Sequence, residues 1–327
     1  MNKLVNIETA ARLIREGASL SLAAPEAVLD KLPRGNWIGG TIPYFMVDSG
    51  GVVVADDQVF VTDLSHAGNV TIAYYAANDL EGIVKHAPEN GFSLIIIPSG
   101  SPAHERFATD AANYKDAFLR PTVGWISGIH LSKFGKETPK VYDGRTTRKH
   151  QDGAVVAYVQ LPKDKLASVE IINPFESDNG DVLRFAEASH EVRDCLVNGE
   201  LTNFAQYLAR RALTDGRTPM IGDFANAPLN VSLQKVDAAA GTVSLYAPVF
   251  PGVDYHFAKP LADYTKAFRE RLQAQDHSDV VFSCNCILNF VFGELEGKRI
   301  GGVEGPFTFG EIAYQLLNQT LVSVRIV

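Results

Sequence analysis

One arrangement of residues recurs three times along the chain, and it restricts the possible folds more than any other feature. Residues 19–45, 93–130 and 279–309 each begin with an apolar strand, pass through a turn of small residues into a helix, and end in a second strand marked by glycine. A strand that is apolar on both faces needs cover on both, and the following helix supplies one cover. Glycine in the next strand permits a bulge or the close approach of another backbone. The pattern predicts an α/β fold of mixed sheets with repeated strand-helix-strand units.

The similarity among the three segments lies in pattern more than in identity. Ile-Gly-Gly opens the second strand in two of them, at Ile38–Gly40 and Ile300–Gly302. A match of three residues also arises by chance, so internal duplication and coincidence both explain it.

Composition excludes several classes of protein. The chain has 327 residues, of which 46% are hydrophobic and 21% charged, and this is enough for two ordinary domains or one large one. A formal net charge of -8 gives no general attraction to nucleic acid or to an anionic membrane surface. The first residues predict an amphipathic helix over 7–17, and no window has the ~20 apolar residues of a membrane span. Three cysteines make a poor disulfide framework, so we expect a cytoplasmic protein that binds neither nucleic acid nor membrane.

Between the repeated segments the chain reads less clearly. Residues 182–213 show amphipathic patterns that predict helices. Residues 131–153 are charged and rich in turn-forming residues, which predicts a surface excursion or a boundary region.

The third segment contains a run of small polar and thiol side chains at the end of its first strand, namely Ser283, Cys284, Asn285 and Cys286. Turns that follow such strands meet glycine-containing strands at one edge of a sheet, where α/β proteins usually bind ligands. A thiol that faces the first turn of a helix has its thiolate favoured, although cysteine is equally common as a small buried hydrophobic residue. One Cys-x-Cys pair cannot supply the four ligands of a structural zinc ion, so we predict no metal site.

Two carboxylates follow in the run "GGVEGPFTFGEI". Partial burial of Glu304 or Glu311 among Gly, Pro and Phe raises a carboxyl pKa or aligns the group to accept a ligand amine. The alternative for Glu311 is a turn carboxylate that accepts backbone N–H groups.

The same C-terminal residues resemble a known family. "FSC" at Phe282–Cys284, "GGVEGPFTFGEI" at Gly301–Ile312 and "LNQTLV" at Leu317–Val322 resemble the C-terminal half of FIST domains, and "NWIGGTIPYF" at 36–45 is similar to a strand of the N-terminal half. The resemblance implies a stand-alone, divergent member with two halves, 1–165 and 166–327, packed together. It also implies a sensory module that binds a small ligand, and some relatives are linked to haem. No output domain is visible, so a separate signalling protein is an expected partner.

Three functions fit these observations. The leading one is a small-ligand-binding, sensor-like protein whose pocket lies at strand ends between the two halves. Its predicted ligand-binding residues are Gly39, Gly40, Thr41, Ser283, Cys284, Asn285, Cys286, Glu304, Phe309 and Glu311. The alternatives are an enzyme with Cys284 as nucleophile and His66 or His104 as base, and a haem-binding gas sensor, for which the resemblance is the sole reason. An interaction scaffold remains the fourth interpretation.

Overall fold

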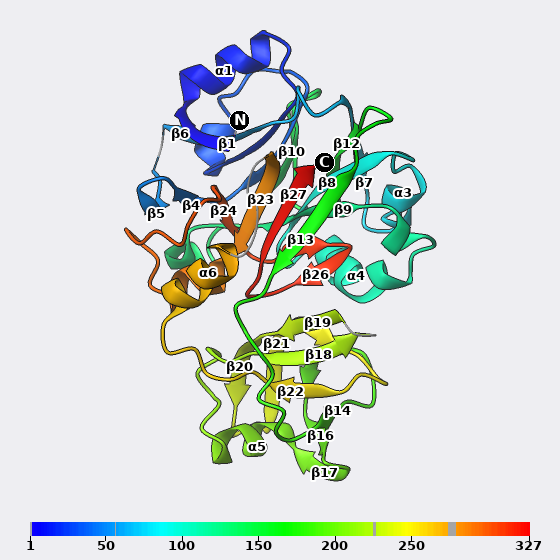
Figure 1. Cartoon of the computed structure of the whole chain (residues 1–327), viewed down its shortest axis with the longest axis vertical. Coiled ribbons are helices and arrows are strands. Elements are labelled where there is room, and N and C mark those ends of the chain that lie inside the picture. Colours follow the sequence, from blue (N-terminus) through cyan, green and yellow to red (C-terminus); the bar gives the residue numbers. More distant parts are fainter. Residues whose placement is uncertain (1, 56, 225–226, 274–278) are drawn as a thin grey trace.

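Most of the chain consists of three units with the same order of elements (Figure 1). The computed structural model describes residues 2–55, 57–224, 227–273 and 279–327. The first unit contains β1 (Asn2–Asn6), α1 (Ile7–Arg15), β2 (Leu20–Ala24), α2 (Glu26–Leu29), β3 (Trp37–Thr41), β4 (Tyr44–Val47), β5 (Gly50–Val53) and β6 (Gln58–Asp63). The second contains β7 (Asn69–Tyr75), α3 (Glu81–Lys85), β8 (Gly91–Pro98), α4 (Pro102–Asp110), η1 (Ala111–Asn113), η2 (Ala117–Leu119), β9 (Thr122–Ser127), η3 (Leu131–Lys133), β10 (Val141–Asp143), β11 (Arg148–His150) and β12 (Ala154–Gln160). The third contains β13 (Ala167–Ile172), α6 (Tyr264–Gln273), β23 (Val280–Cys286), α7 (Ile287–Phe292), β24 (Gly305–Thr308), β25 (Glu311–Ala313), β26 (Gln315–Leu317) and β27 (Leu321–Ile326).

Each unit has a strand-helix-strand element at its centre, as the repeated pattern predicts. β2 and β3, β8 and β9, and β23 and β24 are parallel pairs, joined through α2, α4 and α7 respectively. β6, β12 and β27 run antiparallel beside the first strand of each pair, and β1, β7 and β13 complete the sheets on that side. The prediction of repeated strand-helix-strand units in mixed sheets is therefore confirmed. The class is α/β with sheet dominant, because 42% of the chain is strand and 19% is helix.

Local sequence explains where the helices begin. The Asn6 side chain accepts a hydrogen bond from the Thr9 N–H at 2.8 Å and caps α1, which confirms the helix predicted over 7–17. The Ser101 hydroxyl accepts from the His104 N–H at 3.2 Å, and Pro102 opens α4. β8 is buried along its whole length, as its apolar run requires.

The three units interlock by exchanging hairpins. The β4–β5 hairpin of the first unit lies beside β24, the β10–β11 hairpin of the second lies beside β3, and the β25–β26 hairpin of the third lies beside β9. Val141 is thus opposite Gly40, and Glu311 is opposite Trp125. The polar tract 131–153, predicted as a surface excursion, contains the hairpin that crosses from the second unit to the first. The predicted boundary at 165/166 falls between β12 and β13. Of the three six-stranded sheets that the units form, two combine strands from both sides of it.

An insertion, residues 173–263, leaves the third unit after β13 and returns at α6; it forms the lower end of the molecule in Figure 1. It contains β14 (Leu183–Arg184), β15 (Ser189–Val192), β16 (Asp194–Val197), β17 (Glu200–Asn203), α5 (Phe204–Arg210), β18 (Met220–Phe224), β19 (Ala227–Val231), β20 (Leu233–Asp237), β21 (Thr242–Val249) and β22 (Tyr255–Phe257). The prediction of helices over 182–213 is wrong except at α5. Asn198 and Gly199, with φ of 53° and 88°, form the two-residue turn of a hairpin, a signal that the helical interpretation overlooked.

Where the three units meet, glycine makes room for large side chains. A Cβ on Gly40 would lie 2.6 Å from the Trp125 ring and 2.7 Å from the Ile96 side chain. A Cβ on Gly39 would lie 3.0 Å from the Trp37 ring. These two glycines, predicted to give a ligand access, are in contact with the protein's own core.

Within the described residues, none of the helices combines the length and apolar character that crossing a bilayer requires.

Candidate functional site

A cavity of about 910 Å³, called the large cavity below, lies between the three-unit body and the insertion. On the body side it is bordered by the start of α4, by α7 and by the segment that holds η3. The insertion supplies Ser189, His190 and Glu191 from β15, Gln234 from β20, and Leu245 and Tyr246 from β21. The cavity thus lies beyond the carboxyl ends of β8 and β23, the position at which α/β proteins commonly bind ligands.

Two turns bring the body residues to the wall of the large cavity. After β8 the chain turns through Ser99 and Gly100, whose φ is +70°, so that His104 stands on the first turn of α4. After β23 the chain passes directly into α7, so Ile287, Leu288 and neighbouring apolar side chains also line the cavity. Small residues at one turn and apolar residues at the other therefore shape the site.

His104 presents an unused hydrogen-bond donor. Its Nδ1 accepts a hydrogen bond from the Gly100 N–H at 3.2 Å, so the neutral ring carries its proton on Nε2. Burial, with a smaller effect of the nearby His190, lowers the pKa of His104 to about 4, and the ring is neutral at pH 7. Nε2 is buried and has no partner among the described residues.

Asn318 presents the complementary acceptor. Its Nδ2 donates to the Leu317 carbonyl at 3.0 Å, whereas its buried Oδ1 has no partner in the described structure. A buried polar atom without a partner costs about 1–3 kcal/mol unless something else satisfies it. His104 and Asn318 both line the large cavity, although the two unpartnered atoms themselves are covered.

Behind the wall lies a cluster of buried polar groups around Glu311. Its Oε2 accepts hydrogen bonds from the Thr320 N–H at 3.2 Å and the Thr320 hydroxyl at 2.9 Å. Burial raises the pKa of Glu311 to about 8, so the group is a neutral carboxylic acid at pH 7. Burial, and then the Glu311 carboxyl, raise the pKa of Cys284 and Cys286 well above the usual value. Both thiols are therefore protonated at neutral pH.

The predicted site residues fall in several places. Cys286 and Phe309 line the large cavity. Cys284 is fully buried, and its Sγ–H donates to the Gly124 carbonyl at 3.3 Å. Asn285 is buried in a network with Asn289, whose Nδ2 donates to the Asn285 side-chain oxygen at 2.9 Å.

Three more of the predicted residues lie away from the large cavity. The Ser283 hydroxyl donates to the Glu304 carbonyl and fixes the approach to β24. Glu304 itself borders a hollow of about 80 Å³ next to Arg299. Thr41 lines a different cavity, of about 560 Å³, called the charged cavity below. The structure therefore does not gather the ten predicted residues around a single pocket.

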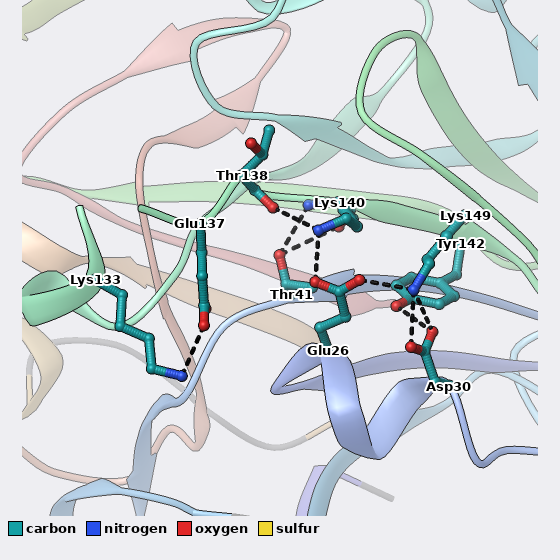
Figure 2. A network of polar contacts seen from close by, with 9 residues as sticks. All are labelled: Glu26, Asp30, Thr41, Lys133, Glu137, Thr138, Lys140, Tyr142 and Lys149. Atoms are coloured by element: carbon teal, nitrogen blue, oxygen red, sulfur yellow. Dashed lines mark hydrogen bonds and ion pairs between the residues drawn. The ribbon is translucent and has the colours of Figure 1, made fainter. Parts of the chain in front are cut away.

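Figure 2 shows the polar network beside the charged cavity. Glu26 on α2 forms ion pairs with Lys140 and Lys149, and Asp30 pairs with Lys149 and accepts from the Tyr142 hydroxyl at 2.8 Å. Burial raises the pKa of Glu26, but the bonds from the two lysines outweigh it, and the net pKa lies below the usual value. These charges satisfy one another and join α2 of the first unit to the exchanged hairpin of the second. The network thus has a structural explanation, whereas His104 and Asn318 in the large cavity do not.

One segment separates the two cavities. Leu131 and Phe134 face the large cavity, and His130, Lys133 and Glu137 line the charged cavity. Lys133 and Glu137 form an ion pair at 2.9 Å, which is visible in Figure 2. Residues 128–140 therefore act as a shared wall.

Sequence reasoning identified His104 as a residue at a helix start but did not connect it with His190, Tyr246 or the other side chains of the insertion. No signal in the sequence brings β15 and β21 to the ends of β8 and β23, because the contact depends on how the insertion packs. In the described part of the chain, no group of three or more His, Cys, Asp or Glu is placed to hold a metal ion.

We expect the three thiols to be unreactive in the native protein. Cys195, Cys284 and Cys286 are buried, and burial raises the pKa of each, that of Cys195 to about 12. At pH 7.5, alkylation by iodoacetamide followed by intact mass should proceed at least about 100-fold more slowly than in the urea-unfolded chain. Rapid labelling of Cys284 in the folded protein would contradict this expectation and favour a thiol enzyme.

Fold and cavity define an α/β protein of three interlocked units, with an insertion that completes the wall of a large cavity at strand ends. Residues 5–327 match the model of a family of unknown function (DUF6976), and the chain belongs to this family. Searches among curated proteins and among solved structures found no match.

The predicted membership of the FIST family was wrong, because no FIST domain is found in the chain. The matching runs are rich in glycine, and local structure explains several of these residues. Gly301 has a positive φ of 116°, and others are closely packed. A Cβ on Gly305, for example, would lie 2.4 Å from the Ser283 carbonyl oxygen. The resemblance was the reason to expect two packed FIST halves, a sensory role and haem. Without it, these expectations have no support.

Proposed function

We propose that the protein binds a small organic molecule in the large cavity, between the three-unit body and the insertion. The observation that carries this proposal is the cavity at the strand ends, whose walls are mostly apolar and include a few polar side chains; two of these, His104 and Asn318, each have a covered polar atom without a partner among the described residues. Binding sites for small molecules typically combine an apolar wall with a few such polar groups. A cavity of about 910 Å³ has room for a ligand of drug-like size.

The proposal is binding without covalent chemistry. The thiol that lines the cavity, Cys286, is kept protonated by burial, and a protonated thiol is a poor nucleophile. His104 is neutral and hydrogen-bonded through Nδ1, so in this proposal its Nε2–H is the donor for a ligand acceptor. The free Oδ1 of Asn318 is the acceptor for a ligand N–H or O–H group.

The test fills the cavity without disturbing the core. Val291 lies on α7, lines the cavity and is 42% exposed, so Val291→Trp adds a ring to the cavity wall. Ile171→Trp is the matched control, since Ile171 is 38% exposed and lies on β13, away from the cavity. Wild type and both variants are purified gently, examined by native mass spectrometry, and screened by thermal shift against a library of small molecules.

We expect retained or added molecules to bind the wild type and Ile171→Trp, and to bind Val291→Trp at least tenfold more weakly, because a Trp side chain occupies part of the cavity. Equal binding by Val291→Trp and Ile171→Trp would move the site elsewhere and overturn the proposal.

A further inference from the structure

The large cavity has an uneven distribution of charge. Glu105 on α4 and Glu191 on β15 lie on its solvent side, both exposed, one from the body and one from the insertion. No Lys or Arg is among the described residues that line it. Neither carboxylate forms an ion pair with any described residue. The entrance is therefore lined with negative charge that the protein itself does not neutralise.

The two histidines of the cavity do not offset this charge at neutral pH. Burial lowers the pKa of both His104 and His190, so both rings are neutral at pH 7. An anionic ligand would lose its hydration and be repelled by two carboxylates, and no positively charged side chain among the described residues that line the cavity would offset these costs. A positively charged ligand would be attracted by both carboxylates.

The buried acceptor provides a second, independent indication. Asn318 is 1% exposed, lines the cavity, and has an Oδ1 without a partner in the described structure. Asn318 Oδ1 is covered, and once this side chain turns toward the cavity an ammonium or amine N–H group would satisfy the oxygen. A carboxylate would not, because it only accepts hydrogen bonds and would repel the Asn318 oxygen. Ser99, Ser189 and Gln234 are uncharged polar residues of the wall, and most of the rest is apolar or aromatic, including Leu245, Tyr246 and Leu288, which fits an apolar ligand body. Aromatic faces also attract cations.

We infer that the ligand of the large cavity is an organic amine, with a positively charged amino group on an aromatic or alkyl body. This inference rests on the proposed function and specifies its ligand class. A hydroxyl, ether or carbonyl oxygen on the same molecule is the natural acceptor for His104 Nε2–H.

The test uses matched molecules that differ only in charge. Tryptamine, tryptophol and indole-3-acetate carry the same ring with a positive, neutral or negative end. Phenethylamine, phenylethanol and phenylacetate form a second set, and octylamine, octanol and octanoate a third. Dissociation constants are measured at pH 7 by calorimetry or ligand-observed NMR, in 20 mM and 300 mM NaCl.

We expect the amine of at least one set to bind about tenfold or more tightly than its carboxylate, with a difference that shrinks at high salt. Glu105→Gln with Glu191→Gln should weaken the amine about five- to twentyfold and leave the matching alcohol unchanged. The control, Glu89→Gln with Glu187→Gln, removes two exposed carboxylates that do not line the cavity and should change neither.

The outcomes separate the two proposals. If an alcohol binds and Val291→Trp abolishes its binding, but the amine binds no tighter than the carboxylate, the amine inference fails while the cavity remains a binding site. If no amine of the three sets binds the wild type, the amine inference fails, and the library screen with Val291→Trp and Ile171→Trp still decides whether the cavity is a binding site.

Discussion

Replacement of Gly124 by alanine is expected to lower the free energy of unfolding by about 4 kcal/mol or more, or to prevent folding. Gly124 lies in β9 between Ile95 of β8 and Ile312 of β25, with φ of +151°. A Cβ at this position would lie 1.9 Å from the Ile95 carbonyl oxygen and 2.8 Å from its carbonyl carbon. Backbone atoms in the middle of a sheet cannot move aside as a flexible side chain can, so the overlap breaks the pairing of β8 with β9.

Gly135→Ala separates the two causes of destabilisation at Gly124. Gly135 also has a positive φ, +78°, but a Cβ there would have no atom within 4 Å. Its substitution should cost only about 1–2 kcal/mol, the usual cost of a left-handed backbone for alanine. Urea unfolding followed by circular dichroism gives both values. A Gly124→Ala protein as stable as Gly135→Ala would show that the strands are not packed as closely as described.

The second large effect concerns pH. Glu311 has a pKa of about 8 in the folded protein, against 4.5 for the free side chain, because it is buried. Between these values the folded state binds a proton that the unfolded state has lost. This group therefore makes the free energy of unfolding fall by about 1.4 kcal/mol per pH unit as the pH rises from about 5 to 8.

Glu311→Gln removes this dependence while keeping the shape of the side chain. The amide oxygen can accept from Thr320 as the acid does, so the variant should be within about 1 kcal/mol of the wild type at pH 5. At pH 8 the variant should be the more stable protein by several kcal/mol, because it has no proton to lose.

The measurement is the difference in the free energy of unfolding between wild type and variant, by urea titration at half-unit steps from pH 5 to 8.5. Other titrating groups are common to both proteins and largely cancel in that difference. Glu187→Gln, at an exposed position, should give a flat difference curve. A flat curve for Glu311→Gln as well would show that Glu311 is ionised in the native protein and that the cluster around it is arranged differently.

The three strand-helix-strand units could be predicted because the signals for their strands and helices lie in short stretches of the sequence. Buried strands such as β8 are continuous apolar runs, and α4 starts with a Ser101 cap followed by Pro102. Ile-Gly-Gly was a poor guide to their alignment, because Gly39 and Gly40 lie within β3 whereas Gly301 and Gly302 precede β24. The exchange of hairpins could not be predicted from the local sequence, because β10 and β11 are three residues each and lie in a polar tract.

The candidate site could be predicted only on the body side. Cys286 ends β23 and Phe309 follows β24, and the rule that ligands bind at strand ends led to the prediction of these two residues, which line the large cavity. His190 and Tyr246 come from the insertion, whose packing against the body depends on contacts between distant residues. Glu311 was selected because it is a carboxylate among Gly, Pro and Phe. Its full burial and raised pKa follow from its position opposite Trp125 in a neighbouring unit's sheet.

The exchanged hairpins also determine the order in which this protein can be assembled. β9 is synthesised in the middle of the chain, yet its neighbour β25 is synthesised only after the insertion and β23 have been made. Until then β9 has an unpaired edge, and such an edge can form hydrogen bonds with strands of other chains. Contacts between such distant residues also slow folding. A ribosome-bound chain that ends before β25 therefore exposes an aggregation-prone edge, and we expect chaperones to bind such nascent chains until the third unit arrives.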